Sequence, residues 1–542
     1  MRRWNGWGDE TRHYHVSPSI ETLLGQLVGP ATPPRDATLA EVVASVPPTR
    51  LPDHPLVSAD AAERVRHARG QSFPDLVATR SGRIGVFPDG VAFPQTSAEV
   101  RELLDYARAN GVRVIPYGGG TSVVGHINPQ AGDQPVLTLN LSRLSRLIDF
   151  DPRERLATFG AGVAGPDLEA ELRARGYTLG HFPQSFELST LGGWIASRSS
   201  GQQSLGFGRI EQLWAGGRIE TPSGPLDLPP FPASAAGPDV REMLLGSEGR
   251  MGVITEATVR VQPLPEHDDV HAIFFPTWEQ AQTAARQMVQ SRAPLSMLRL
   301  STPTETMTNL ALASQRRLIG LLERGLAWRG AGAGKCMLLA GVMGGAAQVK
   351  LSRQTILRIA GGHGGIHLGR ALGKQWQKGR FRAPYLRNSL WERGYAVDTL
   401  ETATTWNKVT PLLESVEGAL RAGLAGENER VHAFTHLSHF YASGSSIYTT
   451  YVFRLGRDAD ETMARWQALK TAASQAIVAG GGTISHQHGV GRDHAPYLAA
   501  EKGRLGMRAI QSLTAAFDPD GLLNPGVLLA DINEGSIDHA LA

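Results

Sequence analysis

The sequence of 542 residues lacks several features that mark particular protein classes. It holds one cysteine, Cys336, so no intrachain disulfide can form and too few thiolates are present for an iron–sulfur cluster. Its longest weakly apolar run, residues 336–347, is too short and too rich in glycine to cross a bilayer. The first ten residues, MRRWNGWGDE, contain no apolar stretch typical of a secretory signal. We therefore expect a cytoplasmic protein, at most in peripheral contact with a membrane.

A strong excess of charge is also missing. Lys and Arg number 54 against 51 Asp and Glu, a net charge of +3, which gives no reason to expect a nucleic-acid partner. Glycine (62) and proline (33) are abundant, which predicts many tight loops. The length suits two to four domains.

Short strands and helices alternate along most of the chain, which predicts an α+β fold. Among the helices, we expect Ser97 to cap residues 97–111, and Thr410 to cap residues 410–422 with Pro411 at the first helical position. Further expected helices are 58–70, 165–176, 192–199, 277–291, 458–479 and 502–517, and expected strands include 112–115, 136–139, 252–261, 270–275 and 447–453. The two tryptophans of RWNGWG, residues 3–8, predict that the amino-terminal tip docks on the body of the protein.

One loop stands out, PYGGGTSVVG at residues 116–125, directly after an expected buried strand. Three consecutive glycines can expose backbone N–H groups as a concave nest for an anion such as a pyrophosphate. Thr121 and Ser122 add hydroxyl donors. On its own, such a run is as often an ordinary turn as an anion site.

Three further loops share the same small and hydroxyl-bearing character. They read PQSFELSTLGG (183–193), SRSSG (197–201) and GSEGRMGVITE (246–256). In this order and spacing, the four loops resemble the flavin-binding domain of the vanillyl-alcohol oxidase/PCMH superfamily. The resemblance implies FAD, with these cofactor-binding residues: Pro116, Tyr117, Gly118, Gly119, Gly120, Thr121, Ser122, Gln184, Ser185, Glu187, Ser189, Thr190, Ser197, Arg198, Ser199, Ser200, Glu248, Gly249, Gly252, Val253 and Ile254.

The superfamily resemblance also implies a domain order. It gives a lead-in segment over 1–85 and a PCMH-type FAD-binding domain over 86–265. A substrate (cap) domain with an antiparallel sheet follows over 266–482, and a segment over 483–542 returns to the flavin and completes the active site. Superfamily members that bind FAD covalently often carry a histidine in or near this loop. Here no histidine precedes His126, so the resemblance implies non-covalent FAD.

More of the chain resembles one branch of the superfamily, the alkyldihydroxyacetonephosphate synthases. The matching stretches are RWNGWG, PQSFELSTLGGW, RNSLWERGYAVDTLETATTW (387–406) and SSIY (445–448) ahead of GGTISHQHGVG (481–491). The resemblance implies an FAD-dependent transferase that exchanges the acyl group of acyl-dihydroxyacetone phosphate for a fatty alcohol. The product is an ether lipid precursor, formed without net redox. It also implies lipid-like small-molecule substrates and a homodimer.

The same resemblance assigns site residues. Tyr448 matches the catalytic acid/base, although a tyrosine of a core strand would fit the pattern as well. Arg387 matches an arginine of the substrate site, and its alternative is a surface ion pair. Arg299 matches a second substrate-binding arginine by a weaker local similarity. His486, Gln487 and His488 fall on a triple-histidine motif, and they complete the expected catalytic set. Gln487 departs from the motif, since glutamine cannot shuttle protons near neutral pH.

The ending DPDGLLNPG, residues 518–526, keeps another function open, because it is typical of FAD-dependent dehydrogenases and oxidases of 2-hydroxy acids. Some of these hold a divalent metal beside the position of Gln487, but an amide is a poor ligand and we expect no metal. The alternatives are thus such a redox enzyme, or a flavin-binding scaffold without chemistry. A basic cluster, Lys374, Lys378, Arg380 and Arg382, could serve a phosphate or a membrane, or form a solvated face.

Overall fold

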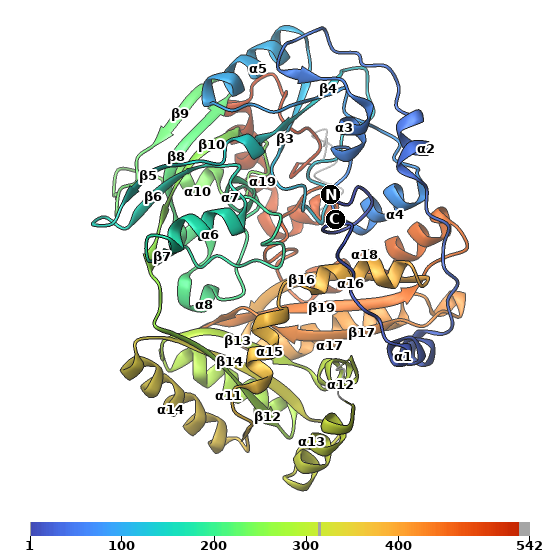
Figure 1. Ribbon diagram of the computed structural model, residues 1–542, viewed down its shortest axis with the longest axis vertical. Coiled ribbons are helices and arrows are strands. Elements are labelled where there is room, and N and C mark those ends of the chain that lie inside the picture. The colour runs from blue at the N-terminus through green and yellow to red at the C-terminus, as the bar shows by residue number, and fades with distance from the viewer. Residues whose placement is uncertain (1, 313–315, 530–542) are drawn as a thin grey trace.

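The computed structural model describes residues 2–312 and 316–529, and it divides into two sheet-containing halves (Figure 1). The half drawn at the top of Figure 1 holds two larger sheets and a two-stranded one, β11(Gln262–Pro263)-β7(Tyr177–Thr178). The first has the order β1(Val57–Ser58)-β2(Gly90–Ala92)-β4(Val136–Asn140)-β3(Arg113–Tyr117), and β2, β4 and β3 run parallel. The second is antiparallel, with the order β5(Leu147–Asp151)-β6(Leu156–Gly160)-β10(Val253–Arg260)-β8(Trp214–Thr221)-β9(Gly224–Leu228).

The lower half is built on one antiparallel sheet of eight strands. Its order is β15(Ile366–His367)-β12(His267–Phe275)-β14(Cys336–Gly344)-β13(Leu295–Ser301)-β17(His432–Leu437)-β19(Gly444–Arg454)-β16(Tyr395–Thr405), with β18(Phe440–Tyr441) paired to β19. Four helices pack on one face: α11(Trp278–Gln290), α14(Ala346–Gly362), α17(Trp406–Ala422) and α18(Ala459–Ala479). Together the two halves confirm the expected α+β class and the antiparallel sheet expected in the second domain.

Side-chain alternation along these strands separates a packed face from an open one. On β13, Leu298 and Leu300 join the helix-covered core, whereas Met297 and Arg299 line a cavity on the other face. On β19 the core takes Ile447, and Tyr448 faces the cavity. The open face of the sheet therefore presents a row of functional side chains toward the upper half.

The ends of the chain tie the two halves together. Trp7 is buried and exchanges two hydrogen bonds with Asn388: its N–H donates to Oδ1 at 3.0 Å, and Nδ2 donates to its carbonyl at 2.8 Å. This contact confirms the predicted docking of the tip. At the other end, Leu523 bridges to Val114 of β3, and Nδ2 of Asn524 donates to the carbonyls of His126 and Glu248.

The remaining helices connect and cover these sheets. In the upper half and lead-in segment they are α1(Pro18–Val28), α2(Leu39–Ala44), α3(Ala61–Arg66), α4(Phe73–Ser81), α5(Ser97–Ala109), α6(Gly165–Arg173), α7(Leu191–Ala196), α8(Ser204–Phe207), α9(Ile210–Leu213) and α10(Val240–Leu244). In the lower half and tail they are α12(Pro303–Leu312), α13(Arg316–Trp328), α15(Ala371–Gly379), α16(Ala383–Trp391) and α19(Ala495–Phe517). None of the helices in the described ranges combines the length and apolar character needed to cross a membrane.

Two predicted helix starts were wrong. The N-cap of α5 is Thr96, whose hydroxyl accepts from the N–H of Glu99. Helix α17 begins at Trp406, so Pro411 lies inside it rather than at its first position. Tertiary contacts fix this earlier start, because the backbone N–H of Trp406 donates to the carbonyl of Ser443 and its indole N–H to that of Tyr441.

Candidate active site

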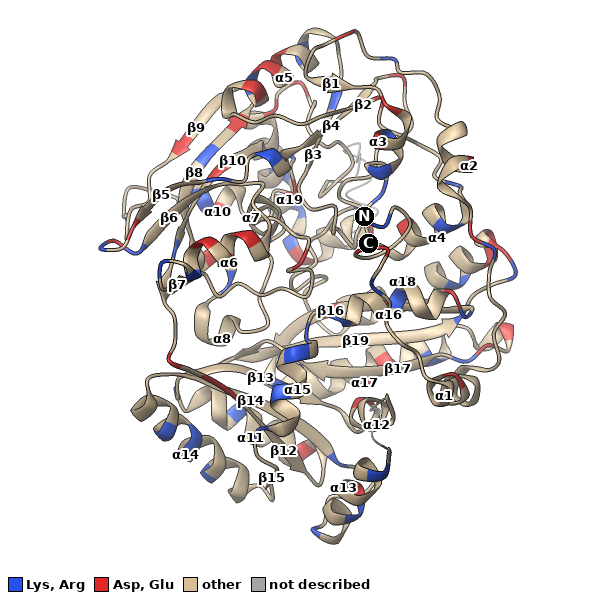
Figure 2. Cartoon of the chain, viewed as in Figure 1, with Lys and Arg blue, Asp and Glu red and all other residues tan. Residues whose placement is uncertain are grey.

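A cavity of about 770 Å³ takes its lining from both halves of the protein. The upper half contributes the loops at 116–123, 183–200 and 247–254, and the lower half contributes the open face of the eight-stranded sheet. Charged side chains of both signs are mixed over the two halves (Figure 2), as the small net charge predicts.

The glycine loop fits a ligand that needs close backbone approach. A Cβ added at Gly119 would lie 1.9 Å from the carbonyl oxygen of Leu188, and one at Gly118 would lie 2.3 Å from Oγ1 of Thr190. Gly120 has φ +62°, which side chains rarely allow. Only glycines let these two loops approach so closely, and all three glycines line the cavity. FAD, with its pyrophosphate, matches such a cradle.

Most of the expected cofactor residues line this cavity, and three do not. Glu187 instead accepts hydrogen bonds from Arg12 and from the Tyr385 hydroxyl. Arg198 forms an ion pair with Glu242 at 2.9 Å, and Val253 is fully buried in the core beneath β3. These three positions therefore support the loops from outside the cavity.

Tyr448 stands at the centre of the open sheet face. Its hydroxyl donates to Oε1 of Gln184 at 3.3 Å, which links the cap sheet to the 183–193 loop. Its ring stacks on that of His436 at 4.8 Å between centroids. Burial raises the pKa of Tyr448 well above its ordinary value, and it outweighs the lowering by the Arg299 charge. The phenol is therefore protonated near neutral pH and can donate a proton rather than accept one.

Arg299 also faces the cavity, but its charge is already paired. Its Nη2 lies 2.6 Å from Oε1 of Glu305, the buried carboxylate in the first turn of α12. Nδ1 of His436 lies 2.9 Å from the same oxygen. Arg299 and His436 together hold the pKa of Glu305 at about 2, against the raising effect of burial.

His486 lies behind the cavity wall, outside its lining. Its Nδ1 is 3.1 Å from Oε1 of the buried Glu401, and its Nε2 is 2.8 Å from Nη1 of Arg209 and 2.7 Å from the Tyr441 hydroxyl. A guanidinium can only donate, so Nε2 accepts and Nδ1 carries the proton that faces Glu401. This network makes His486 a supporting residue of the site.

The ligand atoms of Glu401, His439 and His486 lie within 4.8 Å of one another, a set that a metal could use. The Arg209 contact opposes that use, because it leaves the proton of His486 on Nδ1, where a metal would have to bind. A guanidinium cation beside the same ring is a second unfavourable feature. The geometry favours a hydrogen-bonded cluster.

Gln487 and His488, the other two residues of the motif, do line the cavity. The rings of His488 and Tyr448 meet edge to face at 6.0 Å, and burial lowers the pKa of His488. The motif thus divides into one supporting histidine and two side chains at the cavity surface.

Arg387 enters the same cavity from α16 as a buried guanidinium. Its Nη1 donates to the carbonyl of Gln71, while its Nε and Nη2 have no partner among the described residues. Burial is the main cause of its lowered pKa. A buried cation with free donors favours an anionic ligand.

The basic cluster does not form a single solvated face. Arg380 packs over the rings of Phe182 and Phe381, at 4.5 and 4.8 Å from their centroids, and burial lowers its pKa to about 10. Arg380 and Arg382 line the cavity, whereas Lys374 and Lys378 are exposed.

One branch of the cavity is apolar. The cavity-lining residues of α12 change from Glu305 in its first turn to Leu310 and Leu312 at its end. Further apolar side chains join them from α13, β14 and α15: Ile319, Met337, Leu339, Leu372 and Trp376. The cavity therefore suits a ligand with a polar head and a long apolar tail.

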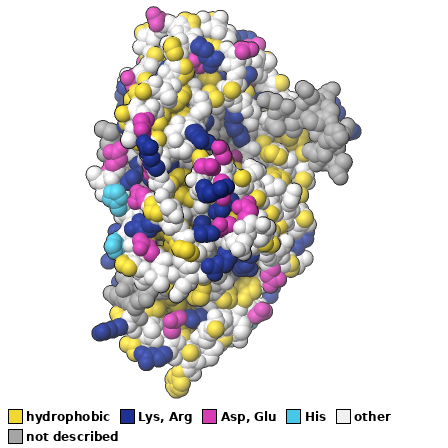
Figure 3. Space-filling view, turned by 90° about the vertical axis from the view of Figure 1, so that its right-hand side faces the viewer, with side chains coloured by type: hydrophobic (Ala, Val, Ile, Leu, Met, Phe, Trp, Pro, Cys, Tyr) yellow, Lys and Arg dark blue, Asp and Glu magenta, His cyan; other side chains and the backbone are white. Residues whose placement is uncertain are grey.

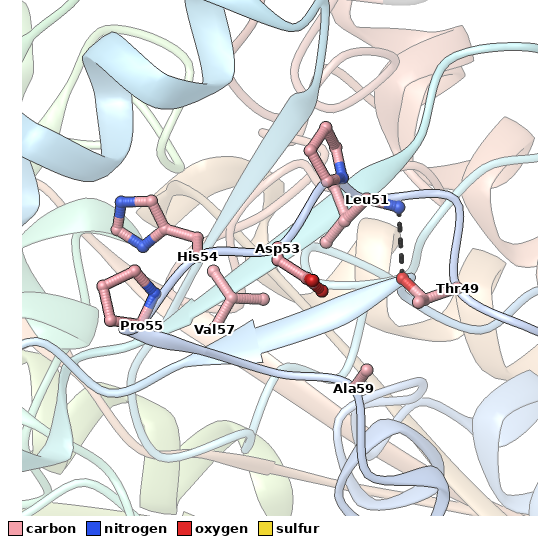
Figure 4. Close-up of a pocket in the computed structure, with 8 residues that line it drawn as sticks. Thr49, Leu51, Asp53, His54, Pro55, Val57 and Ala59 are labelled. Carbon is pink, nitrogen blue, oxygen red and sulfur yellow. Dashed lines mark hydrogen bonds between the residues drawn. The ribbon is translucent and has the colours of Figure 1, made fainter.

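A second, smaller pocket of about 350 Å³ lies in the lead-in segment and shares no residue with the central cavity (Figure 4). Asp53 and His54 are its ionisable side chains, and the others are Thr49, Leu51, Pro52, Pro55, Val57 and Ala59. Its Thr49 hydroxyl accepts from the N–H of Leu51 within the segment. This hydrogen bond stabilises the local turn and gives no sign of a ligand site.

No motif of the sequence predicts His436, Glu305, Glu401 or His439 as site residues. The only local signal for the first is the histidine-rich run at 432–439, where residues four apart on a strand share one face. His436 and Tyr448 are direct register partners in the sheet, a pairing that no local pattern reveals.

Comparison with known proteins agrees with this architecture. The model of the FAD binding domain family matches residues 88–226, and that of the C-terminal domain of FAD linked oxidases matches residues 264–528. The alkyldihydroxyacetonephosphate synthase of Dictyostelium discoideum is 29% identical, over 98% of this chain and 94% of its own length. The enzyme of the same name from Trypanosoma brucei brucei is 28% identical, over 97% and 92%.

Solved structures give the same result. A structure of an alkyldihydroxyacetonephosphate synthase superposes with a TM-score of 0.83 at 27% identity, covering 97% of this chain and 98% of that one. A p-cresol methylhydroxylase structure, at 12% identity and a TM-score of 0.66, shares the fold. The chain therefore combines an FAD binding domain with the C-terminal domain of FAD linked oxidases, and it is similar over nearly its whole length to alkyldihydroxyacetonephosphate synthases.

Proposed function

We propose that this protein is an FAD-dependent transferase that exchanges the acyl group of acyl-dihydroxyacetone phosphate for a fatty alcohol. The reaction forms an ether lipid precursor and involves no net redox. When bound, non-covalent FAD supplies the reactive ring system and returns to its starting oxidation state. One observation carries the proposal: a single cavity joins the FAD loops, a buried guanidinium without an anionic partner, and an apolar branch.

Arg387 is the proposed phosphate ligand. Its free Nε and Nη2 are the donors that a guanidinium uses for bidentate contact with a phosphate. Arg299 has a different role, because its guanidinium is already paired with the Glu305 carboxylate and is less available to a substrate anion. We assign it to holding the sheet side chains in place.

Tyr448 is the proposed proton donor at the exchange site. Its raised pKa keeps the phenol protonated, so it can stabilise or protonate a departing carboxylate. Gln487 and His488 line the same cavity and can form hydrogen bonds to substrate oxygens. The contact of His486 with Glu401 orients the turn that carries these two residues.

The test supplies FAD-loaded protein with acyl-dihydroxyacetone phosphate and a fatty alcohol under anaerobic conditions. We expect an ether product, a released fatty acid and no lasting bleaching of the flavin spectrum. Absence of ether with a normal flavin spectrum would refute the proposal. Lasting reduction by a 2-hydroxy acid or alcohol would instead identify a redox enzyme.

Peripheral membrane contact is part of the proposal, because both substrates carry long chains. Helix α13 exposes Leu318 and Leu321 by 59% and 58% and Trp328 by 90%. Figure 3 shows apolar and basic side chains next to one another at the lower end of the molecule, the end where α13 lies. Such a pairing is typical of helices that lie in a lipid interface. Co-sedimentation with anionic vesicles tests the contact.

We also propose a homodimer, on the resemblance to the synthases. Light scattering on the FAD-loaded protein tests this proposal, and a monomer mass at micromolar concentration would refute it.

A further inference from the structure

His436 is a carboxylate-backed histidine with one ring nitrogen facing the cavity. Its Nδ1 lies 2.9 Å from Oε1 of Glu305, and the ring lines the cavity beside Tyr448. Its Nε2 has no hydrogen-bond partner among the described residues and is not fully buried. The nitrogen is therefore open to a ligand.

The position of the Nδ1 proton decides what Nε2 can do. Two groups contact Nδ1: the Glu305 carboxylate at 2.9 Å and Nη2 of Arg299 at 3.1 Å. Arg299 already donates to Glu305 at 2.6 Å and to the Ser301 hydroxyl at 3.1 Å. An unprotonated Nδ1 would put two acceptors face to face at 2.9 Å, whereas a proton there makes a charge-assisted hydrogen bond. Nδ1 therefore carries the proton, and Nε2 presents a lone pair to the cavity.

His486 differs from His436 in this respect. It too has a carboxylate at Nδ1, but Arg209 and Tyr441 occupy its Nε2 and it does not line the cavity. Tyr448 cannot take the role either, because burial keeps its phenol protonated.

His436 also stands where the two kinds of lining meet. Across the open sheet face, β14 contributes the apolar Met337 and Leu339, and its neighbour β13 contributes Met297 and Arg299. On the other side of β17, β19 contributes Tyr448. The intermediate strand β17 contributes Phe434 and then His436. A fatty alcohol with its chain in the apolar branch would bring its hydroxyl to this boundary.

We propose that His436 is the general base that accepts the hydroxyl proton of the incoming fatty alcohol, an inference that rests on the proposed function. The O–H bond breaks and its proton moves to Nε2. An electron pair of the alcohol oxygen forms the new C–O bond to the carbon of the dihydroxyacetone phosphate unit that carries the acyl group. The bond between that carbon and the acyl oxygen breaks, and the fatty carboxylate leaves with its electron pair. The proton then passes from Nε2 to water or to the carboxylate. Glu305 is a positioning residue that holds the Nδ1 proton.

The charged groups facing His436 set its pH behaviour. Glu305 of α12 and Glu401 of β16 raise the pKa of His436, while Arg299 of β13 and, above all, burial lower it below 6.5. Tyr448 of β19, stacked on the ring, stays neutral. The base is therefore unprotonated at neutral pH, and its action should fail as the pH falls through the lowered pKa.

The deciding experiment compares two nucleophiles in the FAD-loaded enzyme. A fatty alcohol must lose a proton to react, but a fatty carboxylate has none to lose. Ether formation and the exchange of labelled fatty acid into acyl-dihydroxyacetone phosphate are measured for the wild type and for His436→Gln. We expect the variant to lose about 10²- to 10⁴-fold in ether formation, the range for general-base catalysis, and to keep its exchange rate. His432→Gln, on the same strand but outside the cavity, is the control, and both its rates should stay at the wild-type level.

The possible results separate cleanly. Unchanged ether formation in His436→Gln, or equal loss of ether formation and exchange, would overturn the base role. Failure of the wild type in both reactions, with FAD bound, would overturn the proposed function and the base role together. If the variant does not fold, the wild type still decides: ether formation should fall below the pKa of His436 while exchange continues, and parallel pH profiles would contradict the inference.

Discussion

Replacing Arg387 with methionine should stabilise the ligand-free protein and abolish its response to phosphate. The guanidinium is buried, and two of its nitrogens, Nε and Nη2, lack partners among the described residues. Each unpaired buried donor costs about 1–3 kcal/mol. Methionine fills a similar volume and gives up one hydrogen bond, that to the carbonyl of Gln71, worth about 1 kcal/mol. We expect a net gain of about 1–5 kcal/mol, the cost of two unpaired donors less that of one lost hydrogen bond.

Arg299 provides a matched control with the opposite sign. It lines the same cavity, but it donates to Glu305 at 2.6 Å and to Ser301 at 3.1 Å. Arg299→Met would leave a buried carboxylate without its cation, a change that costs about 3–5 kcal/mol. The same substitution at two arginines of one cavity should thus shift stability in opposite directions.

Urea unfolding of the FAD-loaded proteins, with and without inorganic phosphate, measures both effects. Phosphate should raise the free energy of unfolding of the wild type. Without phosphate, Arg387→Met should have a higher free energy of unfolding than the wild type, and phosphate should not raise it further. If Arg387→Met is destabilised as much as Arg299→Met, the guanidinium is satisfied in the folded protein and the reasoning fails. If phosphate stabilises Arg387→Met as it does the wild type, the anion binds elsewhere.

Three further outcomes are expected. Gly119→Ala should lower FAD affinity at least tenfold in a titration, because its Cβ would lie 1.9 Å from the Leu188 carbonyl, whereas Gly418→Ala, with open space around it, should not. Because the pKa of Glu305 is about 2 rather than 4.5, stability on the order of 3 kcal/mol is present above pH 4.5 and lost as the pH falls toward 2; Glu305→Gln should lack this acid dependence in unfolding measurements. Trp328→Ser should weaken sedimentation with anionic vesicles while leaving the flavin spectrum unchanged.

The sequence allowed prediction of those parts of the fold that local chemistry determines. The glycine loop at 116–125 is recognisable because its backbone requirements admit few other residues. Helices α11 and α18 begin directly after the expected first residues, Thr277 and Asp458, since each cap side chain accepts from the N–H three positions on. Helix α17 escaped the same reasoning, because distant carbonyls anchor its first turn.

The partners of the proposed catalytic side chains could not be predicted in this way. His436 meets Tyr448 through strand register and Glu305 through the packing of α12 on the sheet, and neither contact leaves a trace in local sequence. The fate of the arginines shows the same limit. Arg299 and Arg387 were both predicted to bind substrate, yet Arg299 is paired with Glu305 and Arg387 has two nitrogens without a partner among the described residues.

The three-dimensional structure explains why the motif can hold a glutamine at position 487. A histidine missing from the motif would matter most if the motif were the only source of a proton acceptor. It is not, because His486 is committed to Glu401 and Arg209 behind the wall, while β17 brings His436 with an open nitrogen to the cavity. Proton transfer and substrate contact are thus divided between a strand and a turn that are about 50 residues apart in sequence. With the acceptor on the strand, the turn needs only to offer hydrogen bonds, which Gln487 can do as well as an imidazole.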